Sequence, residues 1–212
     1  MFGRKKVAML VAEFVGTYAL ASAVFALAGR TSFPFFPAVA AGTTLALMVF
    51  MFGAVSGAHI NPAVTFGLWT LRKVPTSQAI VFVAVQMLAG FVALRVNERL
   101  LNSSVEHLAK TNWDWRVIVA EAIGTLVFTM GIAAAIYGKY EGGRLAAAIG
   151  MSLTVGVLVA SFGASGWLNP AVALAANSLS ASYVLGPLIG AVLGMNIYAL
   201  LFAPTTANAK RR

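Results

Sequence analysis

Six runs of mostly apolar residues limit, more than any other feature, what this chain can fold into. A helix needs about 20 residues to cross the hydrocarbon core of a bilayer, which is roughly 30 Å thick, and each run is close to that length. The runs cover about residues 7–28, 37–56, 76–96, 116–137, 145–163 and 182–202. Charged residues make up only 10% of the chain, against about 25% in soluble domains. The sequence therefore predicts an all-α membrane protein with six transmembrane helices.

The basic residues predict how these spans are oriented. Six spans place both chain ends on one side of the membrane. Ten of the fifteen Lys and Arg residues share that side: Arg4, Lys5, Lys6, Arg72, Lys73, Lys139, Arg144, Lys210, Arg211 and Arg212. Cytoplasmic segments carry the excess of basic residues, so we expect a multi-pass protein of the cell membrane with both termini cytoplasmic. Because the basic residues flank apolar runs, the net charge of +9 does not indicate nucleic acid as a partner.

Two Asn-Pro-Ala triplets indicate an internal repeat. They begin at Asn61 and Asn169, which are 108 positions apart. The same offset relates three further pairs: Glu13 and Glu121, Gly16 and Gly124, and Gly42 and Gly150. Each half contains three spans, an odd number, so the second half must cross the membrane in the opposite direction. The sequence therefore predicts an inverted 3+3 repeat, about 1–108 and 109–212, within one transmembrane domain of residues 1–212.

The triplets also predict two short helices. Asn is a favoured N-cap and Pro is favoured at the first helical position, so Asn61-Pro62-Ala63 and Asn169-Pro170-Ala171 should each begin a helix. About nine residues follow each Asn before polar residues return, which is about 14 Å, or half a bilayer. Inverted symmetry makes the two half-helices meet at their N-termini. The positive dipole ends there repel cations and protons, and the Asn amides can donate hydrogen bonds into a lumen.

These motifs resemble the aquaporin, or major intrinsic protein, family over nearly the whole chain. AEFVGTYAL and AEAIGT resemble the family's glutamate motifs, SGAHINPAVTFGLW and LNPAV its two pore loops, and VAVQMLAG its third-span pattern. The resemblance implies a channel of six helices plus two half-helices, with one pore per subunit. It also implies a homotetramer in the lipid bilayer, with no cofactor.

The resemblance implies roles in supporting the pore for three polar residues, Glu13, Glu121 and His59. Glu13 and Glu121 would accept hydrogen bonds from the pore loops, whereas the residues alone also allow carboxylates that reach the membrane surface. His59 matches a histidine beside the pore, where it would be either structural or pH-sensing. The chain shows no acid–base pair, metal cluster or nucleophile–base set. We therefore expect no catalytic residue, no metal site and no enzyme activity.

The second pore loop departs from the family pattern at a position that controls selectivity. Family members usually place Arg directly after the second triplet, where it narrows an outer constriction, but this chain has Val172. The resemblance assigns the other three constriction positions to Ala41, Val157 and Gly166. Four small apolar residues predict a wider and less polar constriction, without the fixed charge and donors of an arginine.

Other residues are candidates to replace the missing arginine. Trp167 lies next to Gly166 and would either fill the vacated space or anchor the loop at the membrane interface. Arg95 and Arg116 could add charge at the outer mouth, although nothing in the sequence places them in the lumen.

The expected function is a passive channel for water and for small uncharged solutes up to the size of glycerol or urea. The alternative from the same residues is a channel of relaxed selectivity that conducts anions or mainly a solute other than water. An active transporter also uses inverted repeats and broken helices. It usually needs intramembrane charges to bind a coupling ion, and the only in-span acidic residues here are Glu13 and Glu121.

Overall fold

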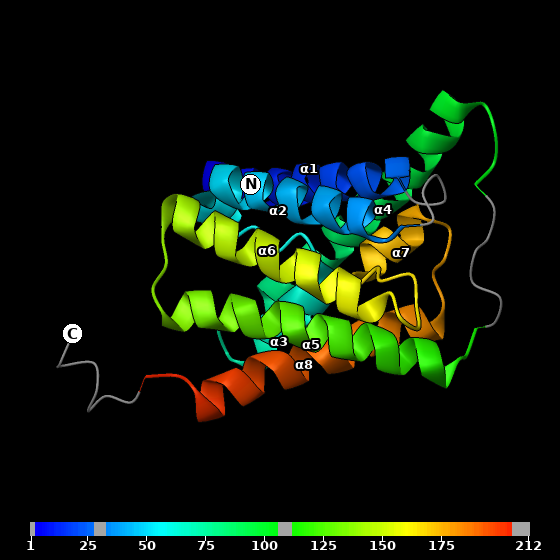
Figure 1. Cartoon of the computed structure of the whole chain (residues 1–212). Helices are drawn as coiled ribbons and strands as arrows, with labels where there is room; N and C mark the ends of the chain where they lie inside the picture. The colour runs from blue at the N-terminus through cyan, green and yellow to red at the C-terminus, as the bar shows by residue number, and fades with distance from the viewer. Residues whose placement is uncertain (1–2, 28–32, 106–111, 205–212) are drawn as a thin grey trace.

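Six long helices and two short ones make up the described part of the chain (Figure 1). This computed structural model describes residues 3–27, 33–105 and 112–204. The long helices are α1 (Arg4–Leu27), α2 (Phe35–Ser56), α4 (Thr76–Leu101), α5 (Trp115–Tyr137), α6 (Gly142–Ala160) and α8 (Ala181–Leu201). The short helices are α3 (Pro62–Thr70) and α7 (Pro170–Ala175).

All six long helices are apolar and long enough to cross a membrane. This confirms the predicted spans and an all-α, multi-pass membrane protein. The end of the first predicted span, at residue 28, and the expected repeat boundary near residue 108 lie outside the described residues.

The largest difference from the predicted spans is at the end of α4. The sequence places that end at residue 96, but the helix continues to Leu101 and stops at Asn102, which has a left-handed φ of 50°. Hydropathy marks only the apolar part of a helix. The backbone continues to satisfy its own hydrogen bonds through polar residues that lie beyond the hydrocarbon core.

Helix packing follows the internal repeat. The pairs α1–α2 and α1–α4 in the first half correspond to α5–α6 and α5–α8 in the second. Each short helix packs against the last long helix of the other half, α3 on α8 and α7 on α4. In Figure 1, α1 begins and α8 ends at the same end of the bundle. The two halves therefore interlock as an inverted 3+3 repeat.

Two glycines related by the repeat let α2 and α6 approach closely. A Cβ atom added to Gly42 would meet the Gly150 carbonyl, and one added to Gly150 would meet the Gly42 carbonyl and the Ala46 side chain. Small residues at such contacts are how helices pack tightly in lipid. The contact joins the two halves of the molecule.

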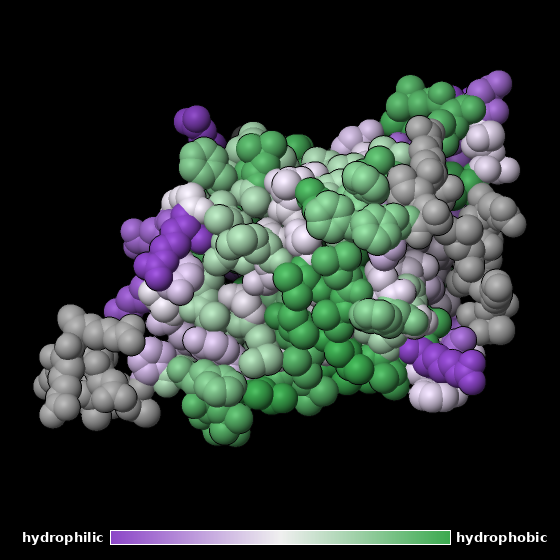
Figure 2. Space-filling view, in the orientation of Figure 1, coloured by the Kyte–Doolittle hydropathy of each residue, from purple (hydrophilic) through white to green (hydrophobic). Residues whose placement is uncertain are grey.

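The surface has the apolar band of a membrane protein. Figure 2 shows hydrophobic residues across the middle of the molecule and hydrophilic residues gathered towards its two ends. Exposed large apolar side chains on the long helices include Leu47, Phe50, Ile80, Leu88 and Met151. The sidedness predicted from the basic residues stays a prediction, and Lys210, Arg211 and Arg212 lie outside the described residues.

The glycine contact between α2 and α6 gives a first prediction. Gly150→Ala should lower the free energy of unfolding by about 1–3 kcal/mol, because the added methyl group overpacks the contact with Gly42. Gly143→Ala is the matched control on the same helix, since a Cβ there meets nothing within 4 Å. Equilibrium unfolding in mild detergent, followed by circular dichroism, measures both. Equal stability of the two variants would contradict the close contact.

Candidate functional site

The two Asn-Pro-Ala triplets begin the two short helices. Asn61 caps α3, where its side-chain oxygen accepts from the Ala63 N–H at 2.8 Å and the Val64 N–H at 3.4 Å. Asn169 caps α7 in the same way, accepting from the N–H groups of Ala171 at 3.0 Å and of Val172 at 3.4 Å. Each Pro occupies the first helical position, where no hydrogen-bond donor is needed.

The second short helix is shorter than the sequence predicts. We expected about nine residues in each, and α3 has 9, but α7 has only 6. The chain leaves the helix because Asn177 adopts a left-handed φ of 48°. The Ser178 N–H then bonds back to the Ala173 carbonyl at 2.8 Å.

The two short helices are joined at their N-termini by reciprocal hydrogen bonds. The Asn61 side-chain amide donates to the Leu168 carbonyl at 2.8 Å, and the Asn169 amide donates to the Ile60 carbonyl at 2.9 Å. Both carbonyls belong to residues with left-handed φ, 55° at Ile60 and 51° at Leu168. Sequence reasoning expected the amides to face a lumen and did not predict this cross-bonding. Each amide carries two N–H groups, so one remains after the cross-bond.

Glu13 holds the first loop through four hydrogen bonds. Its carboxylate accepts from the Ser56 hydroxyl at 2.7 Å and from the N–H groups of His59 at 2.9 Å and Ile60 at 2.7 Å. The Gln86 amide adds a fourth bond at 2.8 Å. Glu13 is fully buried, so its carboxylate does not reach the membrane surface. These are the contacts of a group that fixes the loop backbone.

Glu121 holds the second loop through fewer partners. It accepts from the N–H groups of Trp167 at 3.0 Å and Leu168 at 2.7 Å, the repeat equivalents of His59 and Ile60. Glu121 is also fully buried. The side chains that complete the first network have no polar counterpart 108 positions later. Ser56, Thr65 and Gln86 correspond to Ala164, Ala173 and Gly194.

A cavity beside the joined helix ends brings together eight of the residues singled out from the sequence. It is lined by Asn61, Asn169, His59, Trp167, Ala41, Val157, Gly166 and Val172. The four positions assigned to the constriction thus border one space. The remaining predicted residues, Pro62, Ala63, Pro170, Ala171, Glu13 and Glu121, are buried and are not part of this lining.

Sequence reasoning missed the larger apolar residues of the lining. Leu20 and Phe128 line the cavity, as do Leu45 and Leu153. Each of these pairs is related by the same offset of 108 positions. The repeat was therefore the signal that could have found them, because inverted halves present equivalent positions to a shared centre.

The cavity is narrow and carries little polarity. It offers about 20 Å³ to the centre of a water-sized sphere, and one water needs about 10–15 Å³ by that measure. No Lys, Arg, Asp or Glu among the described residues lines it. Trp167, Phe128 and several leucines border the same space as the four small side chains.

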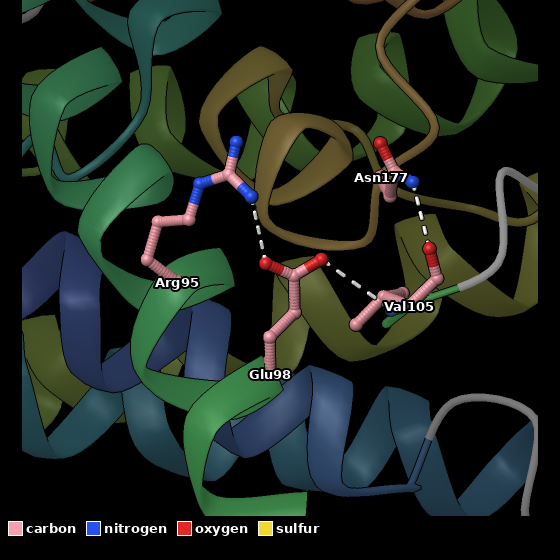
Figure 3. Close-up of polar contacts among 4 residues, drawn as sticks. All are labelled: Arg95, Glu98, Val105 and Asn177. Carbon is pink, nitrogen blue, oxygen red and sulfur yellow. Dashed lines mark hydrogen bonds and ion pairs between the residues drawn. The ribbon is translucent and has the colours of Figure 1, made fainter. Parts of the chain in front are cut away.

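The two arginines considered as substitutes for the missing one lie elsewhere. Arg95 pairs with Glu98 at 2.8 Å, and its side chain is 61% exposed. Figure 3 shows that Glu98 also accepts from the Val105 N–H, whose residue in turn binds Asn177. This cluster ties the end of α4 to the segment after α7. Arg116 lies over the ring of Trp115. Neither arginine lines the cavity.

Comparisons of the sequence with known proteins find relatives in one family. The sequence model of the family described as Major intrinsic protein matches residues 4–198. The chain is 31% identical to aquaporin NIP1-1 of Zea mays over 208 residues, which covers 91% of this chain and 74% of that protein. It is 32% identical to the lens fiber major intrinsic protein of Ovis aries over 189 residues, covering 82% and 72%.

A solved structure supports the fold. The X-ray structure of the aquaglyceroporin from Plasmodium falciparum superposes with a TM-score of 0.71 at 21% sequence identity. The match covers 93% of this chain and 97% of that one.

The unequal carboxylate networks give a second prediction. Glu13→Gln should lower the free energy of unfolding by about 2–4 kcal/mol, because an amide turns an N–H towards donors that need an acceptor. Glu121→Gln should cost less than half as much, since fewer donors lose their acceptor. Glu141→Gln, at an exposed position, is the control. Unfolding in mild detergent measures all three. A larger loss for Glu121→Gln would contradict the asymmetry.

Proposed function

Because the chain belongs to the major intrinsic protein family, we propose that it is a passive channel for water and small uncharged solutes. The observation that carries this proposal is the end-to-end junction of α3 and α7. Their capping Asn side chains hold each other's loops and also border the cavity. Irregular backbone at membrane depth is stable where it is buried in protein or lines a water-filled space. The names aquaporin and aquaglyceroporin among the similar proteins support the same function.

The charge distribution favours neutral permeants. Two helix N-termini point at the junction, and each carries roughly half a positive elementary charge. No carboxylate among the described residues lines the cavity to offset them. The positive helix ends therefore repel a cation or proton at the junction, where the ion would also have to lose its hydration shell. A water or hydroxyl oxygen can accept the remaining N–H of each Asn amide.

The size of the permeant depends on how far the cavity can open. Ala41, Val157, Gly166 and Val172 present only small groups, which is the basis for including solutes as large as urea and glycerol. The present space of about 20 Å³ suits one or two waters. Passage of glycerol therefore requires bordering side chains to move. Trp167 is the largest of them.

Conduction of anions is the alternative that the positive helix ends keep open. The lining opposes it, because most of the groups that border the cavity are apolar and an anion loses its hydration there at high cost. Conductance in a planar bilayer separates the two. Single-channel currents with chloride as the only permeant ion would support the alternative, and their absence together with solute flux would support the neutral channel.

We further propose a homotetramer in the cell membrane with both termini cytoplasmic, as the family resemblance implies. Chemical cross-linking in membranes tests the assembly. Protease access to tags at each terminus tests the orientation.

Osmotic assays on purified protein in liposomes test the main proposal. Shrinkage against sucrose measures water flux, and swelling against urea and glycerol measures solute flux. We expect all three to exceed those of empty liposomes. Flux of water alone, with a strict size limit, would restrict the proposal to water. No flux of any kind would overturn it.

The residue after the second triplet gives a third prediction. Val172→Arg should lower glycerol and urea permeability by about tenfold or more, because a long cationic side chain enters the cavity that Val172 borders. Water permeability should fall less. Val172→Leu is the matched control, since it adds volume without charge or donors. Unchanged solute flux in Val172→Arg would mean that Val172 does not border the permeation path.

A further inference from the structure

We propose that the indole N–H of Trp167 is a specificity-determining donor of this channel, which hydrogen-bonds the oxygen of a solute as it passes the constriction. The constriction here means Ala41, Val157, Gly166 and Val172. The inference rests on the proposed function and names one residue that distinguishes between permeating solutes. The indole N–H would then supply part of the hydrogen-bond donation that the resemblance assigns to an arginine in related pores.

The first support is a buried donor without an acceptor. Trp167 is 6% exposed, and its Nε1 atom has no hydrogen-bond partner among the described residues. Buried N–H groups in proteins are nearly always paired, and an unpaired one is destabilising. Trp167 also borders the cavity. A molecule inside the cavity becomes the partner of this donor when the ring shifts towards the cavity.

The second support comes from comparing the two halves. His59 and Trp167 are repeat equivalents, and both residues border the cavity. The His59 ring is held by a hydrogen bond between its Nδ1 and the Thr65 hydroxyl, at 3.2 Å. The equivalent of Thr65 in the second half is Ala173, which offers no hydroxyl. The Trp167 N–H therefore has no neighbour like the Thr65 hydroxyl that holds the His59 ring.

The third support is the shortage of other donors at the constriction. Its four residues carry no polar side-chain atom. The Ser165 hydroxyl, which also borders the cavity, lies 2.9 Å from the Tyr183 hydroxyl and is engaged there. Arg95 and Arg116 lie outside the lining. The two Asn amides and His59 lie at the junction of the short helices. Among the other residues that line the cavity, Trp167 has the side-chain donor that is not already paired.

The position of Trp167 also determines how the donor acts. The side chain is buried inside the bundle, with its ring centroid 6.5 Å from that of Tyr183, so it does not serve as an anchor at the membrane surface. Because Nε1 is itself buried, a solute reaches it only when the ring shifts towards the cavity. The donor favours molecules that present an acceptor oxygen, such as water, urea and glycerol. The donor offers no favourable interaction to a cation.

The test removes the donor and keeps the ring. Trp167→Phe, reconstituted in liposomes, should lower urea and glycerol permeability per channel by about three- to tenfold. The smaller ring leaves more room, so a purely steric role predicts the opposite change. Trp69→Phe is the matched control, because the Trp69 N–H is already bound to the Thr76 hydroxyl at 3.0 Å and lies outside the cavity lining. It should conduct like the parent chain.

An isosteric replacement checks the result at constant volume. Trp167→3-(3-benzothienyl)alanine exchanges the N–H for sulfur and should reproduce the loss seen with Trp167→Phe. Unchanged or faster solute flux in both variants overturns the inference and leaves the proposed function intact, provided that the parent chain conducts. Loss of flux in Trp69→Phe as well would show a general effect of tryptophan replacement and would also overturn it.

A spectroscopic measurement tests the hydrogen bond of the Trp167 N–H separately from solute flux. The ultraviolet resonance Raman difference between the parent chain and Trp167→Phe isolates the Trp167 indole, whose N–H mode shifts when it is hydrogen-bonded. In hydrated membranes we expect the hydrogen-bonded frequency. The frequency of a free indole N–H would show that no molecule in the cavity binds it and would overturn the inference.

Discussion

The reciprocal hydrogen bonds between the two capping asparagines and the opposite loops are the interaction on which the rest of the structure depends. Each Asn uses its oxygen to begin its own helix and its amide to hold the carbonyl that precedes the other Asn. Neither half-helix spans a bilayer alone. Joined at their N-termini, they form one composite span whose irregular backbone is satisfied inside the protein. The cavity lies beside this junction and is lined by both asparagines.

The two loops are supported by the same carboxylate but not to the same degree. In the first half, Glu13 takes part in a polar network that includes Ser56, Gln86 and, through Gln86, Thr65. In the second half, Ala164, Ala173 and Gly194 replace those three polar residues. A fully satisfied polar network holds one arrangement firmly. The second loop has no such network and has Val172 directly after its triplet, and it is the loop in which Trp167 has an unpaired donor among the described residues.

Sequence periodicity and capping rules predicted much of the site, because those signals are local. The apolar runs marked the spans, and Asn followed by Pro marked the start of each half-helix. Local rules could not predict that the Asn61 amide binds the Leu168 carbonyl 107 residues away. They also gave a half-helix of about nine residues where α7 has 6. Just after α7, Asn177 has left-handed backbone and its side chain binds the Val105 carbonyl, a contact that local rules do not contain. The apolar lining residues Leu20 and Phe128 carry no signal except the repeat.

The sequence by itself determined that the chain crosses a membrane six times, that its halves are inverted copies, and that two short helices begin at asparagines. The spans and the starts of the short helices follow from hydropathy and capping, which act over a few neighbouring residues. The inverted halves follow from motifs that recur at an offset of 108 positions. Only the tertiary structure decided which side chains share the cavity and how little space they leave. Four small residues predict a wider and less polar constriction, and the structure adds larger groups from other helices to the same lining. The width of a lumen is a property of packing between distant segments, and no single segment contains it.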